Sequence, residues 1–150
     1  MGLRLSTWHQ QRVTLDIVKE LLSANPEVCM VRNQDGRSPL HVAAIKGRVG
    51  VLDEVVRVKP ESTRVLTDRG ETVLHLCVVH NRLEGLKLLV ESIGNDKGLM
   101  NSKDCDGNTI LHIAVAKKQI EVCFVILLNY IVGMHVFIFL VCLCDLILSY

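Results

Sequence analysis

The feature that most constrains this chain is an internal repeat with a period of 34 to 37 residues. Three segments of the same form follow one another, at residues 35–44, 69–78 and 106–115. Each contains a glycine, a serine or threonine two positions later, and then a Leu-His pair. Repeats of this length are small structural units that bury a core only by stacking on their neighbours. The sequence therefore predicts a row of similar units rather than one central core.

Each unit is predicted to be a hairpin loop followed by an inner and an outer helix. The glycine suits the hairpin tip because it adopts positive φ at low cost, and the serine or threonine is placed as the N-cap of the inner helix. Gly47 and Asn81 are positioned to end inner helices in a left-handed conformation. Apolar residues at helical spacing indicate outer helices over residues 49–56 and 83–90. The expected fold class is an all-α solenoid.

Apolar residues outside the motif keep the same register and are predicted to face the interior. They form three rows: Leu15, Val49, Leu83 and Ile120; Val18, Leu52, Leu86 and Cys123; and Leu21, Val55, Leu89 and Ile126.

The register divides the chain into parts, although both ends depart from it. The expected parts are a degenerate N-terminal cap at 1–12, a repeat domain at 13–128 (a half-repeat at 13–34 and repeats at 35–68, 69–105 and 106–128) and a hydrophobic tail at 129–150. The half-repeat is expected to have an outer helix over residues 15–22 but no inner helix, because polar residues occupy positions 9–12 where small ones are needed.

The motifs resemble ankyrin repeats. Residues 38–44, Ser-Pro-Leu-His-Val-Ala-Ala, are close to the T-P-L-H-x-A-A signature of that family, whereas Val73 and Ile110 replace its proline in the later copies. Residues 70–77 and 106–114 are similar to those of plant membrane-bound ankyrin proteins, in which cytosolic repeats precede several C-terminal transmembrane helices. The resemblance implies a domain that binds proteins, with a role in plant signalling or in stress and defence responses.

The C-terminal part of the chain is strongly apolar. Residues 122–144 are 23 residues without a charged side chain. As a helix they would be about 34 Å long, enough to cross a bilayer core of about 30 Å. The tail is expected to form a transmembrane helix that overlaps residues 122–128, with Lys117 and Lys118 keeping the repeats on the cytosolic side. In the alternative, the chain is a truncated or alternatively spliced fragment whose hydrophobic tail only caps the repeat stack, and which has no independent function.

No pattern in the sequence indicates catalysis or a cofactor. The histidines of the three motifs recur at one structural position, which indicates a structural role. His75, Cys77 and His80 are not spaced to converge on a metal ion from one helix. No phosphate-binding loop, nucleophile motif or pair of carboxylates is present, and the formal charge of +1 gives no field for nucleic acid. We expect no enzymatic activity, cofactor, metal, nucleic acid or small-molecule substrate.

The remaining hypothesis is a surface that binds a protein partner. In ankyrin-like stacks the hairpin tips and the exposed positions of the inner helices line a concave face. Here these residues are Gln34, Arg37, Ile45, Lys46, Arg69, Glu71, Val79, His80, Asp106, Asn108, Ala116 and Lys117. Lys46, His80 and Lys117 are expected to align as a weakly basic stripe, which favours an acidic partner. The expected location is a membrane, for example the plasma membrane, with the repeats in the cytosol; the alternative is the cytoplasm.

Overall fold

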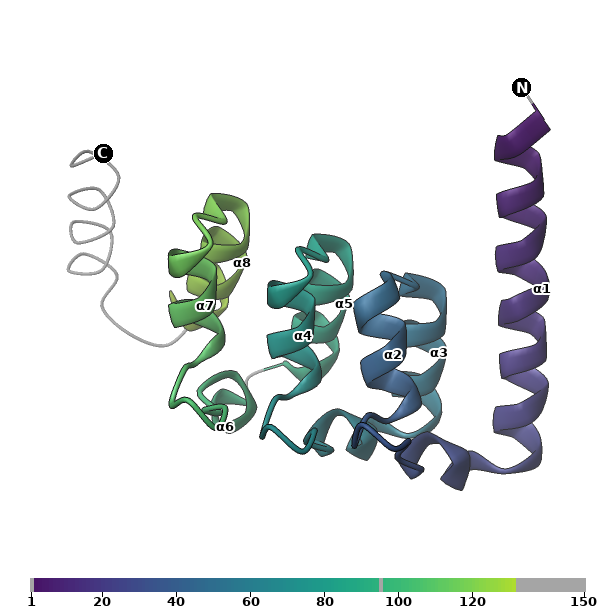
Figure 1. Cartoon of the computed structure of the whole chain (residues 1–150), viewed down its shortest axis with the longest axis horizontal. Helices are drawn as coiled ribbons and strands as arrows, with labels where there is room; N and C mark the ends of the chain where they lie inside the picture. Colours follow the sequence, from purple (N-terminus) through teal and green to yellow (C-terminus); the bar gives the residue numbers. More distant parts are fainter. Residues whose placement is uncertain (1, 95, 132–150) are drawn as a thin grey trace.

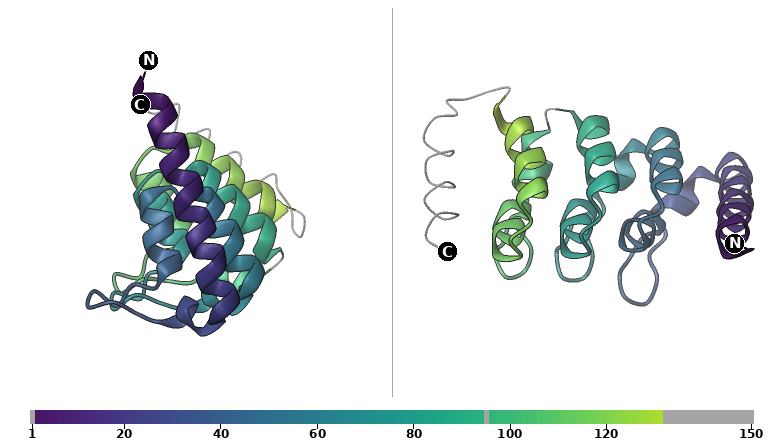
Figure 2. Two further views of the ribbon diagram at one scale, coloured as in Figure 1. Left: turned by 90° about the vertical axis from the view of Figure 1, so that its right-hand side faces the viewer. Right: turned by 90° about the horizontal axis from the view of Figure 1, so that it is seen from above.

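The computed structural model describes residues 2–94 and 96–131 of the chain, which form a stack of helices without strands (Figure 1). Inner helices α2 (Pro39–Lys46), α4 (Val73–Val79) and α7 (Ile110–Ala116) lie side by side. Outer helices α3 (Val49–Val58), α5 (Leu83–Ile93) and α8 (Ile120–Ile131) form a second layer behind them (Figures 1 and 2). The expected all-α stack of helical hairpins is confirmed.

The inner helices begin where the sequence predicts because the same capping box forms three times. The hydroxyl of Thr72 accepts a hydrogen bond from the backbone N–H of His75 at 3.3 Å, and the backbone N–H of Thr72 donates to Nδ1 of His75 at 3.2 Å. Ser38 with His41 and Thr109 with His112 make the same pair of bonds. Each box satisfies two backbone N–H groups that a helix start leaves without an intrahelical partner.

The inner helices also end in the same conformation. Gly47 and Asn81 have positive φ, 67° and 52°, as expected for left-handed residues that close a helix. Lys118 occupies the same position after α7 with φ 56°, although nothing in its side chain indicates this. An L-residue with an ordinary side chain loses about 1 to 2 kcal/mol in this conformation, so the stacked repeat and not the local sequence decides the backbone there.

The core runs through the length of the stack between the two layers of helices. Two of the predicted rows are inside the three complete repeats: Leu52, Leu86 and Cys123 are at most 3% exposed, and Val55, Leu89 and Ile126 at most 1%. The third row, which begins each outer helix, is only half-buried at Val49 and Leu83 and is 50% exposed at Ile120. The interior prediction is therefore right for the middle of each outer helix and wrong for its first residue, which lies at the end of the layer.

The N-terminal unit is a single long helix, α1 (Gly2–Ala24). It crosses the boundary expected between a cap at 1–12 and an outer helix at 15–22, so the backbone does not separate these two parts. No inner helix accompanies α1, as the polar residues at 9–12 suggest. Leu21 was expected in the interior but is 54% exposed, whereas its equivalents in the complete repeats are buried. The prediction for Leu21 was wrong because the helix that would cover it is missing.

Among the described residues, the repeat formed by α7 and α8 is the last in the stack. Leu40 and Leu74 are fully buried, but Leu111 is only half-buried. Phe124 and Leu128 of α8 are more than half exposed. Within residues 2–94 and 96–131, no helix is long and apolar enough to span a bilayer. Residues 122–128, where the predicted transmembrane helix was expected to overlap the last repeat, belong to α8, and Val122, Cys123 and Ile126 are buried in the repeat core. The rest of the transmembrane or capping tail predicted at 129–150 lies, from residue 132 onwards, outside the described residues.

Short helical turns connect the units. The 3-10 helices η1 (Pro26–Met30) and η2 (Pro60–Arg64) start at equivalent prolines, and α6 (Lys97–Met100) takes their place in the third repeat. The side chain of Asp96 caps α6 by accepting from the N–H of Leu99 at 3.2 Å. The three additional residues of this repeat thus rearrange the connection and leave the spacing of the inner and outer helices unchanged.

Candidate protein-binding surface

The three hairpins place half of the predicted binding residues along one rim of the stack, below the inner helices in Figure 1. Each hairpin closes with the same backbone bond, for example from the N–H of Thr67 to the carbonyl of Glu71 at 3.0 Å. Gln34, Arg69 and Asp106 are exposed at the tips, whereas Arg37, Glu71 and Asn108 are half-buried at the closing positions.

The other half lies where the inner helices end. Lys46, His80, Ala116 and Lys117 are exposed there, and Ile45 and Val79 are half-buried. The twelve residues therefore form two parallel rows at opposite ends of the inner helices, about 12 Å apart for a helix of eight residues. Because α2 packs against α4 and α4 against α7, Lys46, His80 and Lys117 follow one another across the three repeats.

The charges of the hairpin rim are partly paired, and those of the helix-end row are not. Arg37 lies 3.9 Å from Asp35, and Arg69 lies 3.7 Å from Asp106. Exposed pairs of this kind contribute about 0 to 1 kcal/mol and open readily for a partner. In the described part of the chain, Lys46 and Lys117 form no ion pair. A basic row whose two lysines form no ion pair among the described residues is suited to a complementary acidic surface.

The motif histidines hold the structure together. Nδ1 of His75 accepts the N-cap N–H, which leaves the proton on Nε2, and Nε2 lies 3.1 Å from the carbonyl of Asn108 in the next hairpin. His75 therefore links its own helix start to the following repeat. Burial lowers the pKa of His41 to about 4, so this ring is neutral at pH 7. A fully buried, neutral histidine in a capping box is not available to a substrate.

Three cysteines of the repeat domain, Cys29, Cys77 and Cys123, are buried and pack as apolar side chains, whereas Cys105 is exposed. Burial raises the pKa of Cys77 to about 12 and also raises the pKa values of Cys29 and Cys123. A thiol with a raised pKa stays protonated at pH 7 and is a poor nucleophile or metal ligand. Of the residues that the structure describes, no three histidine, cysteine or acidic side chains are grouped so that they could hold a metal ion.

A set of polar links between neighbouring repeats was missed in the sequence. The Nε of Arg82 donates to the carbonyl of Ile45 at 3.0 Å, and Nε2 of Gln119 donates to the carbonyl of Val78 at the same distance. Both side chains start from the loop between an inner and an outer helix, 37 residues apart, and reach the last turn of the preceding inner helix. The signal was available in the sequence, because Arg48, Arg82 and Gln119 share one position of the repeat and all carry long donors.

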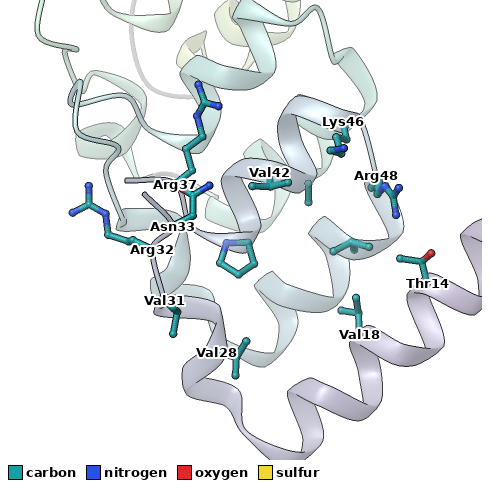
Figure 3. A pocket seen from close by; sticks show the side chains of 13 residues that line it. Thr14, Val18, Val28, Val31, Arg32, Asn33, Arg37, Val42, Lys46 and Arg48 are labelled. Atoms are coloured by element: carbon teal, nitrogen blue, oxygen red, sulfur yellow. Dashed lines mark hydrogen bonds between the residues drawn. The ribbon is translucent and has the colours of Figure 1, made fainter. Parts of the chain in front are cut away.

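A groove of about 530 Å³ lies between α1 and α2, at the N-terminal end of the stack (Figure 3). Its walls are α1, the first hairpin with η1, the exposed side of α2 and the start of α3. Figure 3 shows Thr14 and Val18 projecting from α1 on one side, and Val42 and Lys46 on α2 on the other. No prediction from the sequence pointed to this groove.

Comparisons with known proteins agree with this architecture. The chain is 28% identical over 120 residues to the E3 ubiquitin-protein ligase KEG of Arabidopsis thaliana, a match that covers 79% of this chain and 7% of the ligase. It is 32% identical over 108 residues to a protein of Saccharomyces cerevisiae described as the probable 26S proteasome regulatory subunit p28, which covers 70% of this chain and 46% of p28. The chain thus spans less than half the length of these two relatives.

The sequence also matches the protein family described as ankyrin repeats in three copies, in two overlapping segments at residues 9–101 and 63–136. These segments include all three capping boxes and both layers of helices. The resemblance to ankyrin repeats seen in the motifs is confirmed, and the similarity to one branch of plant membrane proteins stays a prediction. The chain belongs to the ankyrin-repeat family.

Proposed function

We propose that this chain is a non-enzymatic interaction module that binds an acidic surface of a partner protein through its hairpin rim and the ends of its inner helices. The observation that carries the proposal is the row formed by Lys46, His80 and Lys117, which are exposed, follow one another across adjacent repeats and stand beside half-buried apolar residues. Such a combination of apolar contact area and unpaired cations is suited to protein recognition.

The chemistry of the rest of the surface supports binding over catalysis. The buried histidines and cysteines take part in capping and packing, and each has a structural explanation. One relative, p28, is described as a regulatory subunit of a larger assembly, which is compatible with a role in binding. The other is described as a ligase, but this chain corresponds to only 7% of that protein, so the description supports no activity for this chain.

The test is a partner search with matched surface variants. The parent, the double variant H80E/K117E and the control K87E/S92E are used as baits for proximity labelling in cells. The control has the same change in charge, placed on exposed positions of α5. We expect labelled partners shared by the parent and K87E/S92E, and at least tenfold less labelling of the same partners by H80E/K117E. Equal labelling by the two variants would exclude this row as the binding surface.

We also propose that the tail tethers the module to a membrane with the repeats in the cytosol, in a plant signalling, stress or defence pathway. The support is the apolar composition of residues 129–150, where Asp145 is the only charged residue, together with the similarity of the motifs to plant membrane-bound ankyrin proteins; Cys123 and Ile126 of the same uncharged run lie in the repeat core and are not part of this segment. Insertion of such a segment as a helix is favourable by several kcal/mol.

Fractionation of the tagged protein tests the tether. The full chain is expected in the membrane fraction, resistant to alkaline carbonate but extracted by detergent, and a variant lacking residues 132–150 is expected in the supernatant. A full chain that carbonate releases, or that is soluble without detergent, would support the alternative in which the tail only covers the end of the stack.

A further inference from the structure

We propose that the groove between α1 and α2 is a docking site for an amphipathic helix of a partner protein, with an apolar face and acidic flanks, which takes the place of the inner helix that the first unit lacks. This site goes beyond the binding surface proposed above. It lies at the N-terminal end of the stack and shares only Arg37 and Lys46 with that surface.

Burial along the repeat register shows that α2 lacks a neighbour. Val73 and Ile110, the first residues of α4 and α7, are fully buried, because the preceding inner helix covers them. Pro39, at the same position of α2, is only half-buried and lines the groove. The side of α2 that faces α1 is therefore a helix-packing surface that no inner helix covers.

The outer helix of the first unit shows the same vacancy from the other side. Leu21 is 54% exposed, whereas Val55 and Leu89 at the same position are at most 1% exposed. Leu21 shares one face of α1 with Val13 and Ile17, both more than half exposed, because residues four apart lie above one another on a helix. This apolar face adjoins Thr14 and Val18, which line the groove. An incoming helix would thus meet apolar side chains on both walls.

A hydrogen-bond donor is already in place for the end of that helix. Arg82 and Gln119 donate to carbonyls in the last turn of the preceding inner helix. Arg48 occupies the same position of the repeat as Arg82 and Gln119. The inner helix to which Arg48 would donate is the one that the first unit lacks. The exposed side chain of Arg48 lines the groove instead. The C-terminal carbonyls of a docked helix would accept hydrogen bonds from Arg48, as the carbonyls of Ile45 and Val78 do from Arg82 and Gln119.

The charge of the groove selects an acidic helix. Four cationic residues and no acidic one line it: Arg32, Arg37, Lys46 and Arg48. Arg32 is bound to Asp68 at 2.6 Å, and Arg37 faces Asp35 at 3.9 Å, but Lys46 and Arg48 have no ion pair within the described chain. Glutamates beside the apolar face of a partner helix would pair with these two cations. Helices commonly bind in grooves with apolar anchors at i, i+3, i+4 and i+7.

Residues 2–12 continue α1 as a helix, and the lining that α1 gives to the groove begins at Thr14. A second copy of the chain is another possible occupant, and the experiment separates it from a partner helix.

The probes are three fluorescent peptides of sixteen residues. One carries leucines at i, i+3, i+4 and i+7 with flanking glutamates, the second has lysine at each glutamate position, and the third has the composition of the first in an order that destroys the apolar face. Binding to the full chain in detergent is measured by anisotropy at low and moderate salt. The first variant is R48E, and its control is R57E, which reverses the same charge on the outer face of α3. The second variant is V31D, and its control is L66D. All four positions are exposed, so the substitutions are compatible with folding.

We expect the glutamate peptide to bind the parent at least ten times more tightly than either other peptide, with affinity falling as salt rises. R48E and V31D should each weaken binding of the glutamate peptide at least fivefold, and R57E and L66D should each weaken it less than twofold. Equal binding of the three peptides, or equal effects of the groove and control variants, would overturn the proposal. So would a dimer in sedimentation that R48E or V31D dissociates, because a second copy would then occupy the groove. H80E/K117E should leave peptide binding unchanged, so failure here is distinct from failure of the surface proposed above.

Discussion

Replacing the motif leucine in each repeat tests both the stack and its uncovered end. Leu40 and Leu74 are fully buried, and Leu111 is half-buried although it occupies the same position of the motif. Leucine-to-alanine substitutions at buried sites cost about 2 to 5 kcal/mol, the sum of lost transfer free energy and the cavity left behind. The structure therefore predicts different costs for the same change at equivalent positions.

The expected magnitudes follow from the number of covering helices. Leu74 lies in α4, between α2 and α7, so L74A should lower the free energy of unfolding by about 3 to 4 kcal/mol. L40A should cost a similar amount because Leu40 is equally buried. Leu111 is only half-buried, and L111A should cost about 1 to 2 kcal/mol, since part of its side chain is already in water.

The assay is urea unfolding of the repeat domain followed by circular dichroism at 222 nm. The slope of free energy against urea is compared among variants, because an unchanged slope shows that the same surface is exposed on unfolding. L89A and L21A provide a second pair at equivalent positions, fully buried and 54% exposed, with expected costs of about 3 kcal/mol and below 1 kcal/mol. A cost for L111A equal to or above that of L74A would refute the assignment of the uncovered end.

Three further predictions concern pH and the backbone. The pKa of His41 is about 4 in the folded state and 6.5 in the unfolded state, so its neutral form contributes stability above pH 6.5 that is lost as pH falls toward 4. By linkage, the free energy of unfolding should fall by about 2 kcal/mol from pH 7 to pH 5. In an H41Q variant the urea midpoint should depend less on pH over this range. G70A should cost about 1 to 2 kcal/mol in urea unfolding because residue 70 has φ 71°; a cost near zero would contradict the hairpin geometry. K118G should raise the thermal midpoint by a few degrees, equivalent to about 1 kcal/mol, since glycine adopts φ 56° without strain; a lower midpoint would mean that the lysine side chain contributes more than its backbone conformation costs.

The fold could be predicted from sequence mainly where the information is local and repeated. The N-caps predicted at Ser38, Thr72 and Thr109 need only a hydroxyl at the helix start, and they form at all three positions, where the motif histidines complete a capping box. The outer helices begin at the expected residues because the apolar spacing and the preceding left-handed turn both define them. Lys118 adopts the left-handed conformation although lysine does not favour it. Its conformation could be predicted only because Lys118 occupies the same position of the repeat as Gly47 and Asn81.

The sequence predicts the positions of the candidate surface and the alignment of its basic row, but not which of its charges are paired. The register placed Lys46, His80 and Lys117 at equivalent positions, and the packing of neighbouring inner helices makes them adjacent. Pairing was not visible in the sequence: Arg32 binds Asp68 across two hairpins, 36 residues apart. The groove was not predicted because it lies where the first unit has no inner helix, and no sequence motif marks the position of a helix that is missing.

The sequence alone determined the repeat period, the first residues of the helices in the complete repeats and the family, since each depends on residues within one unit or on their recurrence. Only the tertiary structure decided which equivalent residues are covered. Leu21 and Leu89 occupy the same position of the repeat, yet one is in water and the other in the core, because burial depends on the helix that lies alongside. In a stack of similar units that neighbour is missing at an end, and the surface it leaves uncovered is where this chain can accept a helix from another protein.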